Sequence, residues 1–145
     1  EETTAEVLVD GWMHTGDQAT IDAAGYGNIV GRIKDMIIRG GENIYPREIE
    51  EFFFTHDAVE DATVLGVPDE KYGEEVCAWI RLKPGEETSP GDLRDFCKGK
   101  IAHYKVPRYI EIVDEFPMTV TGKIRKIDIR DTMVERLGLN QSETA

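Results

Sequence analysis

The sequence predicts an α+β fold, with a small mixed sheet of about three main strands flanked by helices and a short β-rich segment before it. Three observations favour this class. Of the 145 residues, 40% are hydrophobic and 32% are charged, as in ordinary globular domains. Strand-like and helix-like apolar patterns alternate after residue 33. Residues 1–33, in contrast, contain only short apolar pieces interrupted by Gly and Asp, too few to bury a core alone.

Three segments have the composition of main strands. Residues 62–67 are apolar and precede Pro68, which predicts a buried strand that ends at the proline. In residues 75–83 apolar side chains alternate on one face, which predicts a half-buried strand. Residues 109–113 are predicted to form the third main strand. We also expect a shorter strand over residues 35–39, broken by the glycine pair that follows.

The first of the three predicted helices is marked by a proline at its start, and the last by a glycine at its end. Pro46 opens the first, which carries acidic residues in its first turns, where the helix dipole favours them. Its predicted buried face consists of Ile49, Phe52 and Phe53. The last helix is expected from about Lys126 to Leu137, because Gly138 stops it.

The middle helix is predicted from a proline with capping residues before and after it. Ser89, Pro90 and Asp92 form its start. Its apolar stripe consists of Leu93, Phe96, Cys97 and Ile101. We expect a self-sufficient domain over residues 34–145, in which residues 138–145 are a loose tail.

Charge and composition exclude several function classes. The net charge of −12 disfavours nucleic acid as a partner, and no apolar run approaches the length of a membrane span. Cys77 and Cys97 form no CxxC motif, so we expect them to pack as small apolar side chains in a reducing compartment, the cytoplasm or the mitochondrial matrix. The three histidines lack metal-ligand spacing, and we assign no metal site to this chain.

The segment PMTVTGK, residues 117–123, is the strongest candidate for chemistry. Lys123 offers a mobile ammonium that can bind a phosphate or carboxylate oxygen whose charge grows during a reaction. Gly122 lets the backbone turn tightly beside it. Taken alone, the segment is more typical of an exposed Thr/Gly-rich turn. It is no P-loop, because Pro117 replaces the first glycine and Ile124 follows the lysine.

A basic cluster surrounds this segment. It consists of Lys123, Arg125, Lys126 and Arg130. The cluster is equally typical of an anion site and of a solvated helix edge balanced by nearby aspartates.

Five segments together resemble the carboxy-terminal part of the adenylate-forming enzymes, the superfamily of acyl-CoA synthetases, peptide-synthetase adenylation domains and beetle luciferases. They are GWMHTGD (11–17), GRIKD (31–35), RGGENIYPREIE (39–50), AHYKVPRY (102–109) and PMTVTGKIRK (117–126). Residues 31–51 and YGEEVCAWI (72–80) look most like fatty-acyl-CoA synthetases. The resemblance implies that residues 1–33 end a large AMP-binding domain and that residues 34–145 are a mobile domain.

The resemblance also implies roles for single residues. Asp17 and Arg32 would bind the nucleotide sugar, and Lys34 would be the hinge. Gly40 and Gly41 would line the channel for the pantetheine arm of CoA. Each position also suits an ordinary turn or surface residue. A weaker expectation places CoA phosphates near Tyr104, Lys105 and Arg108.

Lys123 matches the adenylation lysine of that superfamily, which would bridge the substrate carboxylate and the α-phosphate. The implied reaction uses ATP with Mg²⁺, held mainly by the absent amino-terminal domain, then CoA, and activates a carboxylic, specifically fatty, acid. The isolated chain would be inactive. Protein acetyltransferases and deacetylases acting on Lys123 are further expected partners. Two alternatives stay open: a peptide-synthetase adenylation domain, and a non-catalytic interaction module of the same fold.

Overall fold

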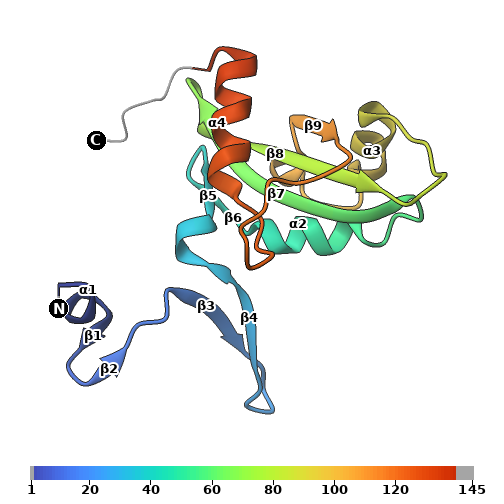
Figure 1. Ribbon diagram of the computed structural model, residues 1–145. Helices are drawn as coiled ribbons and strands as arrows, with labels where there is room; N and C mark the ends of the chain where they lie inside the picture. Colours follow the sequence, from blue (N-terminus) through green and yellow to red (C-terminus); the bar gives the residue numbers. More distant parts are fainter. Residues whose placement is uncertain (1, 140–145) are drawn as a thin grey trace.

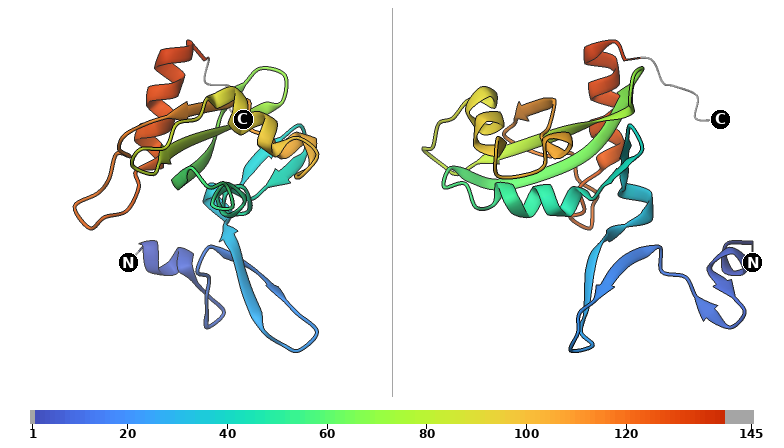
Figure 2. Two further views of the ribbon diagram at one scale, coloured as in Figure 1. Left: turned by 90° about the vertical axis from the view of Figure 1, so that its right-hand side faces the viewer. Right: turned by 180° about the vertical axis from the view of Figure 1, so that it is seen from behind.

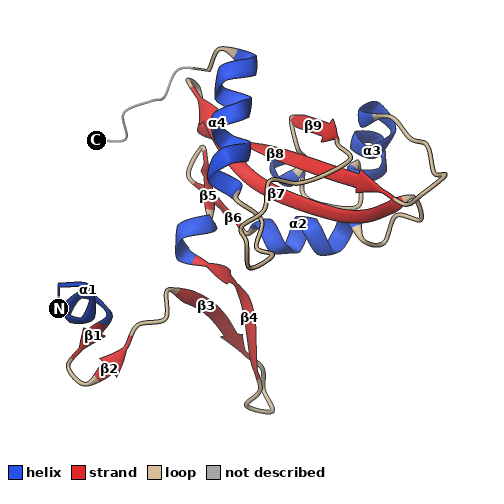
Figure 3. Cartoon of the chain, viewed as in Figure 1, coloured by secondary structure: helices blue, strands red, loops and turns tan. Residues whose placement is uncertain are grey.

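The structure is a computed structural model that describes residues 2–139 (Figure 1). Two small antiparallel sheets come first in the chain. The helix α1 (Glu2–Val7) precedes β1 (Leu8–Val9) and β2 (Trp12–Met13), which pair with each other. The second hairpin pairs β3 (Asp17–Ile21) with β4 (Gly27–Arg32). A five-stranded sheet with helices on both faces follows (Figure 3).

β8 (Gly73–Leu82) is the central strand of the five-stranded sheet. It pairs antiparallel with β7 (Val59–Asp69) along its length, and its first residue pairs with β5 (Ile37–Arg39). β9 (Tyr109–Ile112) runs parallel to β8, and β6 (Glu42–Ile44) extends the sheet beyond β5. The α+β class and the three main strands are therefore confirmed. β6 was not predicted, because three residues carry too little periodicity to signal a strand.

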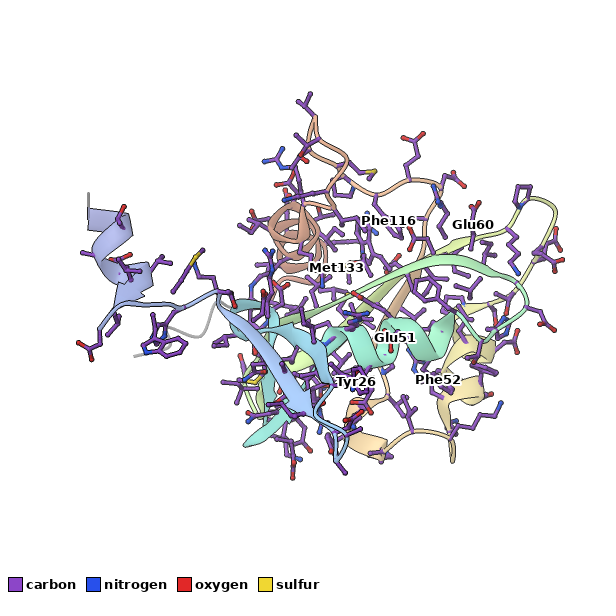
Figure 4. The ribbon with its side chains drawn as sticks, turned by 90° about the horizontal axis from the view of Figure 1, so that it is seen from below. Tyr26, Glu51, Phe52, Glu60, Phe116 and Met133 are labelled. Carbon is purple, nitrogen blue, oxygen red and sulfur yellow. The ribbon has the colours of Figure 1, made fainter. Side chains whose placement is uncertain are left out.

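The helices divide between the two faces of this sheet. α2 (Pro46–Phe53) and α3 (Pro90–Cys97) bury their apolar side chains on one face, and α4 (Lys126–Leu137) buries its own on the other. Figure 4 shows Phe52 of α2 on one side of the sheet, and Met133 of α4 with Phe116 on the opposite side. None of the described helices is long and apolar enough to cross a membrane.

The prediction that residues 75–83 form a half-buried strand is wrong, because β8 is buried on both faces. Val76, Ala78 and Ile80 pack toward α2 and α3. Cys77 and Trp79 point the other way, into the cluster with α4. The alternation in the sequence was real, but the second face is covered as well, by a helix more than forty residues further along the chain.

Several predicted strand and helix ends were misplaced. β5 begins at Ile37 and not at residue 35, because Ile33–Asp35 forms a 3₁₀ turn, and β7 already begins at Val59. α3 ends at Cys97, so Ile101 lies beyond the helix, although it still packs against the core. β7 continues through Pro68 to Asp69. β7 is an edge strand, so one of its sides has no partner strand. A proline whose nitrogen lies on that side costs the sheet no hydrogen bond, and the strand can continue past it. The starts of α2 at Pro46 and α3 at Pro90 agree with the sequence.

The end of α4 is capped as expected by Gly138, which has φ +61°. Leu139 then packs against the α4 side of the core, and its amide donates to the carbonyl of Val134 over 3.0 Å. Residues 140–145 of the expected loose tail lie outside the described residues.

The first part of the chain forms no core of its own. No residue from Thr4 to Met36 is buried, and Ile37 is the first that is. Large apolar side chains of this part are open to solvent, among them Trp12 at 77% and Ile21 at 78% exposure. Two-stranded hairpins of this kind are marginal without further packing.

The two cysteines are free and fully buried, which confirms that they pack as apolar side chains. Burial raises the pKa of the Cys77 thiol to about 12 and that of Cys97 to about 11. Both thiols therefore stay protonated at pH 8, where the reactive thiolate is scarce. We expect iodoacetamide at pH 8 to leave both unmodified in the native chain and to alkylate both in urea, as measured by mass spectrometry. Native alkylation at the rate of a free cysteine would contradict this.

Candidate active site

Lys123 lies on a closed turn between β9 and α4. The amide of Thr119 donates to the Lys123 carbonyl over 2.8 Å, and the amide of Gly122 donates to the Thr119 carbonyl over 2.9 Å. Gly122 has φ +82°, a left-handed conformation that suits the last position of a three-residue hairpin loop. A β-bridge between Met118 and Ile124 forms the base of the turn. The lysine thus extends from a defined backbone conformation.

Lys123 differs from the other cations of the predicted basic cluster. Each of the other three has an acidic partner: Arg125 with Asp128 (3.2 Å), Lys126 with Glu50 (3.2 Å) and Arg130 with Glu74 (3.2 Å). Lys126 also donates to the carbonyl of Val64. The bonds of Lys126 and Arg130 fasten α4 to α2 and the sheet, whereas the pair of Arg125 is local. Lys123 is exposed, and within residues 2–139 its ammonium forms no ion pair. It is the member of the cluster that remains open to a ligand.

Asp17 and Arg32 lie together, although fifteen residues separate them in the chain. They are directly opposite one another in β3 and β4, and Nε of Arg32 is 3.4 Å from Oδ1 of Asp17. Both side chains remain accessible, at 30% exposure for Asp17 and 69% for Arg32. A groove of about 380 Å³ runs past them to the start of α2 and to Lys126. A carboxylate acceptor and a guanidinium donor side by side can bind neighbouring hydroxyl groups.

Lys34 is the middle residue of a single 3₁₀ turn, Ile33–Asp35, which joins β4 to β5. The residues on either side, Arg32 and Met36, have extended backbone conformations. Figure 2 shows this turn as the connection between the β3–β4 hairpin and the five-stranded sheet. Lys34 itself is exposed. A rotation of its backbone would reorient the sheet relative to the hairpin, and it would break the 3.2 Å hydrogen bond that Arg47 of α2 donates to the carbonyl of Ile29 in β4.

Gly40 and Gly41 form the two-residue turn between β5 and β6, with φ of +57° and +88°. Positive φ at both positions is typical of a type I′ hairpin turn. The sequence predicted only that this glycine pair breaks the strand before it, because β6 was not foreseen. A Cβ added to Gly40 would lie 3.1 Å from a ring carbon of Tyr72, whereas one added to Gly41 would meet nothing within 4 Å. The backbone at Gly41 is therefore open on its outer side.

A buried ion pair supports this turn from below. Glu75 is 2% exposed, and one of its carboxylate oxygens accepts a 2.9 Å hydrogen bond from Nε of Arg39. That bond raises the pKa of Arg39. The guanidinium also lies 4.0 Å from the ring centroid of Tyr72. Sequence reasoning missed Glu75 and Tyr72 as supports of the turn. The available signal was the pair Glu74 and Glu75 at the start of a largely apolar strand.

The cations expected near CoA phosphates are already paired. Lys105 donates to both carboxylate oxygens of Glu48, at 2.7 and 2.9 Å, and this hydrogen bond raises its pKa. Arg108 lies 3.3 Å from Asp69 and 3.8 Å from Glu75. Among the described residues, no group of three or more His, Cys, Asp or Glu side chains is arranged to hold a metal ion.

The two candidate reactive elements lie at different places around the sheet. The loop between β9 and α4 and the β5–β6 turn are well separated in all the views of Figures 1 and 2.

The chain matches one family model and several curated proteins. Residues 48–123 match the model described as the AMP-binding enzyme C-terminal domain. YngI of Bacillus subtilis (strain 168), which is named as an acyl-CoA synthetase, is 56% identical over 134 residues, covering 92% of this chain and 24% of that protein. The human medium-chain acyl-CoA ligase ACSF2, mitochondrial, is 52% identical over 139 residues, covering 96% and 23%. The chain therefore spans about a quarter of the length of these relatives.

Solved structures agree with the fold. ATP-bound MatB from Rhodopseudomonas palustris superimposes with a TM-score of 0.84 at 34% identity, over 91% of this chain and 26% of that one. A fatty acyl CoA synthetase from Mycobacterium tuberculosis gives a TM-score of 0.72 at 38% identity, over 93% and 27%.

Proposed function

Because the chain belongs to the AMP-binding enzyme C-terminal domain family, we propose that it is the carboxy-terminal part of an ATP-dependent fatty-acyl-CoA synthetase. The reaction has two steps. A carboxylate oxygen of the acid attacks the α-phosphorus of ATP, the bond to the bridging oxygen breaks, and pyrophosphate leaves. The CoA thiol then loses its proton, its sulfur attacks the acyl carbon, and AMP leaves with the bonding electrons.

The unpaired ammonium of Lys123 on its hydrogen-bonded turn carries this proposal. During the first step, negative charge from the carboxylate and the α-phosphate accumulates in a small volume. A fixed cation lowers the energy of that arrangement more than it stabilises the separate reactants. The neighbouring cations are held by Glu50, Asp128 and Glu74, so Lys123 is the one available for this role in the described part of the chain.

Asp17 and Arg32 are assigned to the nucleotide ribose in this proposal. Their side chains are 3.4 Å apart and open to solvent, which supports joint contact with two neighbouring hydroxyl groups. In this proposal the Mg²⁺ that accompanies ATP is held mainly by the preceding amino-terminal domain.

The second step is assigned to the glycine turn. Gly41 has no side chain and open space beside it, which suits the passage of a thin pantetheine arm. Lys34 is the proposed hinge, since it lies on the short connection to the β3–β4 hairpin. A rotation at Lys34 would withdraw Lys123 from the place of reaction and bring the glycine turn there for the second step. In this proposal residues 1–33 belong to a preceding domain and residues 34–145 to the mobile one, which accounts for the absence of buried residues between Thr4 and Met36.

The substrate and the compartment are further parts of this proposal. Fatty acids are favoured because the human relative is named as a medium-chain acyl-CoA ligase. A reducing compartment, the cytoplasm or the mitochondrial matrix, is favoured by the two free cysteines. An acetyltransferase and a deacetylase that act on the exposed Lys123 are also proposed. Acetylation would remove the charge and stop the first step.

The proposal is tested by comparing the 145-residue chain with the full-length enzyme that contains it. We expect the full-length enzyme to release pyrophosphate only when a fatty acid is supplied, and to form its thioester with free CoA. The chain alone should do neither, because in this proposal the preceding domain supplies the acyl pocket. Acyl-CoA formation by the chain alone would contradict the proposal. Transfer to a carrier protein but not to free CoA would favour the peptide-synthetase alternative.

A further inference from the structure

Thr119 contacts both backbone polar groups of Lys123. Its amide donates to the Lys123 carbonyl over 2.8 Å, and its hydroxyl oxygen accepts a hydrogen bond from the Lys123 amide over 3.1 Å. The carbonyl of Thr119 accepts from Gly122 as well. One residue, four positions before the lysine, therefore fixes the peptide groups on both sides of the Lys123 Cα.

The side chain of Thr119 is itself held in place. Its hydroxyl lies 2.9 Å from the hydroxyl of Thr121 across the turn. A β-branched side chain also has few rotamers, so the oxygen stays where the Lys123 amide needs it. All three residues are exposed, and water can replace these bonds at little cost to stability. The arrangement therefore restricts the conformation of the turn more than it stabilises the domain.

We propose that Thr119 is a positioning residue for adenylation: its hydroxyl fixes the backbone of Lys123 so that the ammonium reaches the α-phosphate in one geometry. This inference rests on the proposed function of Lys123. The physical reason is that a misplaced charge loses much of its effect on a transition state. Without the hydroxyl, the Lys123 amide would bond to water and the turn would sample other conformations.

The test uses three variants of the full-length enzyme, assayed for both half-reactions. Thr119→Val keeps the shape and removes the acceptor, and it is expected to slow adenylation about tenfold, the effect of one hydrogen bond. Thr119→Ser keeps the hydroxyl and should restore nearly the original rate. Thr121→Val is the matched control, because it removes only the hydroxyl–hydroxyl contact, and it should cost less than about threefold. Thioester formation from supplied acyl-adenylate should stay unchanged in all three.

A double-mutant cycle shows whether Thr119 acts through the lysine. In a Lys123→Ala background, Thr119→Val should cause no further loss of adenylation. A further tenfold loss there would overturn the inference, as would an equal loss in Thr119→Ser or an unchanged rate in Thr119→Val. If Lys123→Ala by itself leaves adenylation unchanged, the proposed function fails. If Lys123→Ala slows adenylation and Thr119→Val does not, only the role of Thr119 fails.

Discussion

Replacing Lys123 with Ala is expected to slow acyl-adenylate formation by roughly two to three orders of magnitude, the cost of removing one preorganised donor from a developing charge. Lys123 has no ion pair among the described residues, so no buried partner is left unpaired and the fold should be unaffected. The rate of acid-dependent pyrophosphate exchange in the full-length enzyme measures the effect. Thioester formation from supplied acyl-adenylate should remain close to normal, because the lysine serves the first step.

Arg125→Ala provides the matched control. Arg125 is two residues away and also exposed, but it pairs with Asp128 on its own helix turn. Exposed pairs of this kind contribute little, so its loss should leave both half-reactions unchanged. Equal damage from Arg125→Ala would mean that the local net charge matters and not the Lys123 ammonium. Full adenylation by Lys123→Ala would favour the non-catalytic module.

Gly41→Leu is expected to show the opposite pattern, with thioester formation lowered by at least about a hundredfold and adenylation nearly unchanged. A side chain here enters open space, so it should block a ligand without displacing a neighbour. The left-handed backbone, with φ +88°, adds a strain of about 1–2 kcal/mol for any residue with a Cβ. Single-turnover transfer from acyl-adenylate to CoA measures the effect.

Two variants separate strain from obstruction. Gly41→Ala introduces the same backbone strain with little bulk, so it should impair thioester formation far less than Leu does. Gly85→Leu carries a similar strain, since Gly85 has φ +81° and equally open space, but it lies on the loop after β8. It should leave both steps unchanged. A similar loss in both half-reactions for Gly41→Leu would indicate misfolding, and the assignment of the turn would then be abandoned.

The sequence identified several residues of the candidate site, but it did not reveal the contacts between them. Lys123, Asp17 and Arg32 were chosen from short motifs, and the structure places the last two 3.4 Å apart. Their proximity depends on the register of β3 and β4, which the sequence did not specify. The supports of the glycine turn were missed, because Glu75 meets Arg39 only through pairing between strands far apart in the chain.

The basic cluster illustrates the same division. Four cations near residue 125 looked alike in the sequence, with nearby aspartates as the expected counterions. One of them, Arg125, does pair locally. Lys126 and Arg130 instead bind Glu50 and Glu74, which lie 76 and 56 residues away in the chain. Once these two long-range pairs and the local pair of Arg125 are known, Lys123 is the member of the cluster without an ion pair among the described residues.

By itself, the sequence determined where α2 and α3 begin, where α4 ends and that the chain turns at Gly122, because proline, glycine and capping residues act on the few peptide groups beside them. Pro46, Ser89, Gly122 and Gly138 all act in this way. The tertiary structure decided which faces are buried and which charges are neutralised. Those outcomes depend on helices and strands that meet across dozens of residues, and hydrophobic burial and ion pairing are set by what finally lies opposite each side chain.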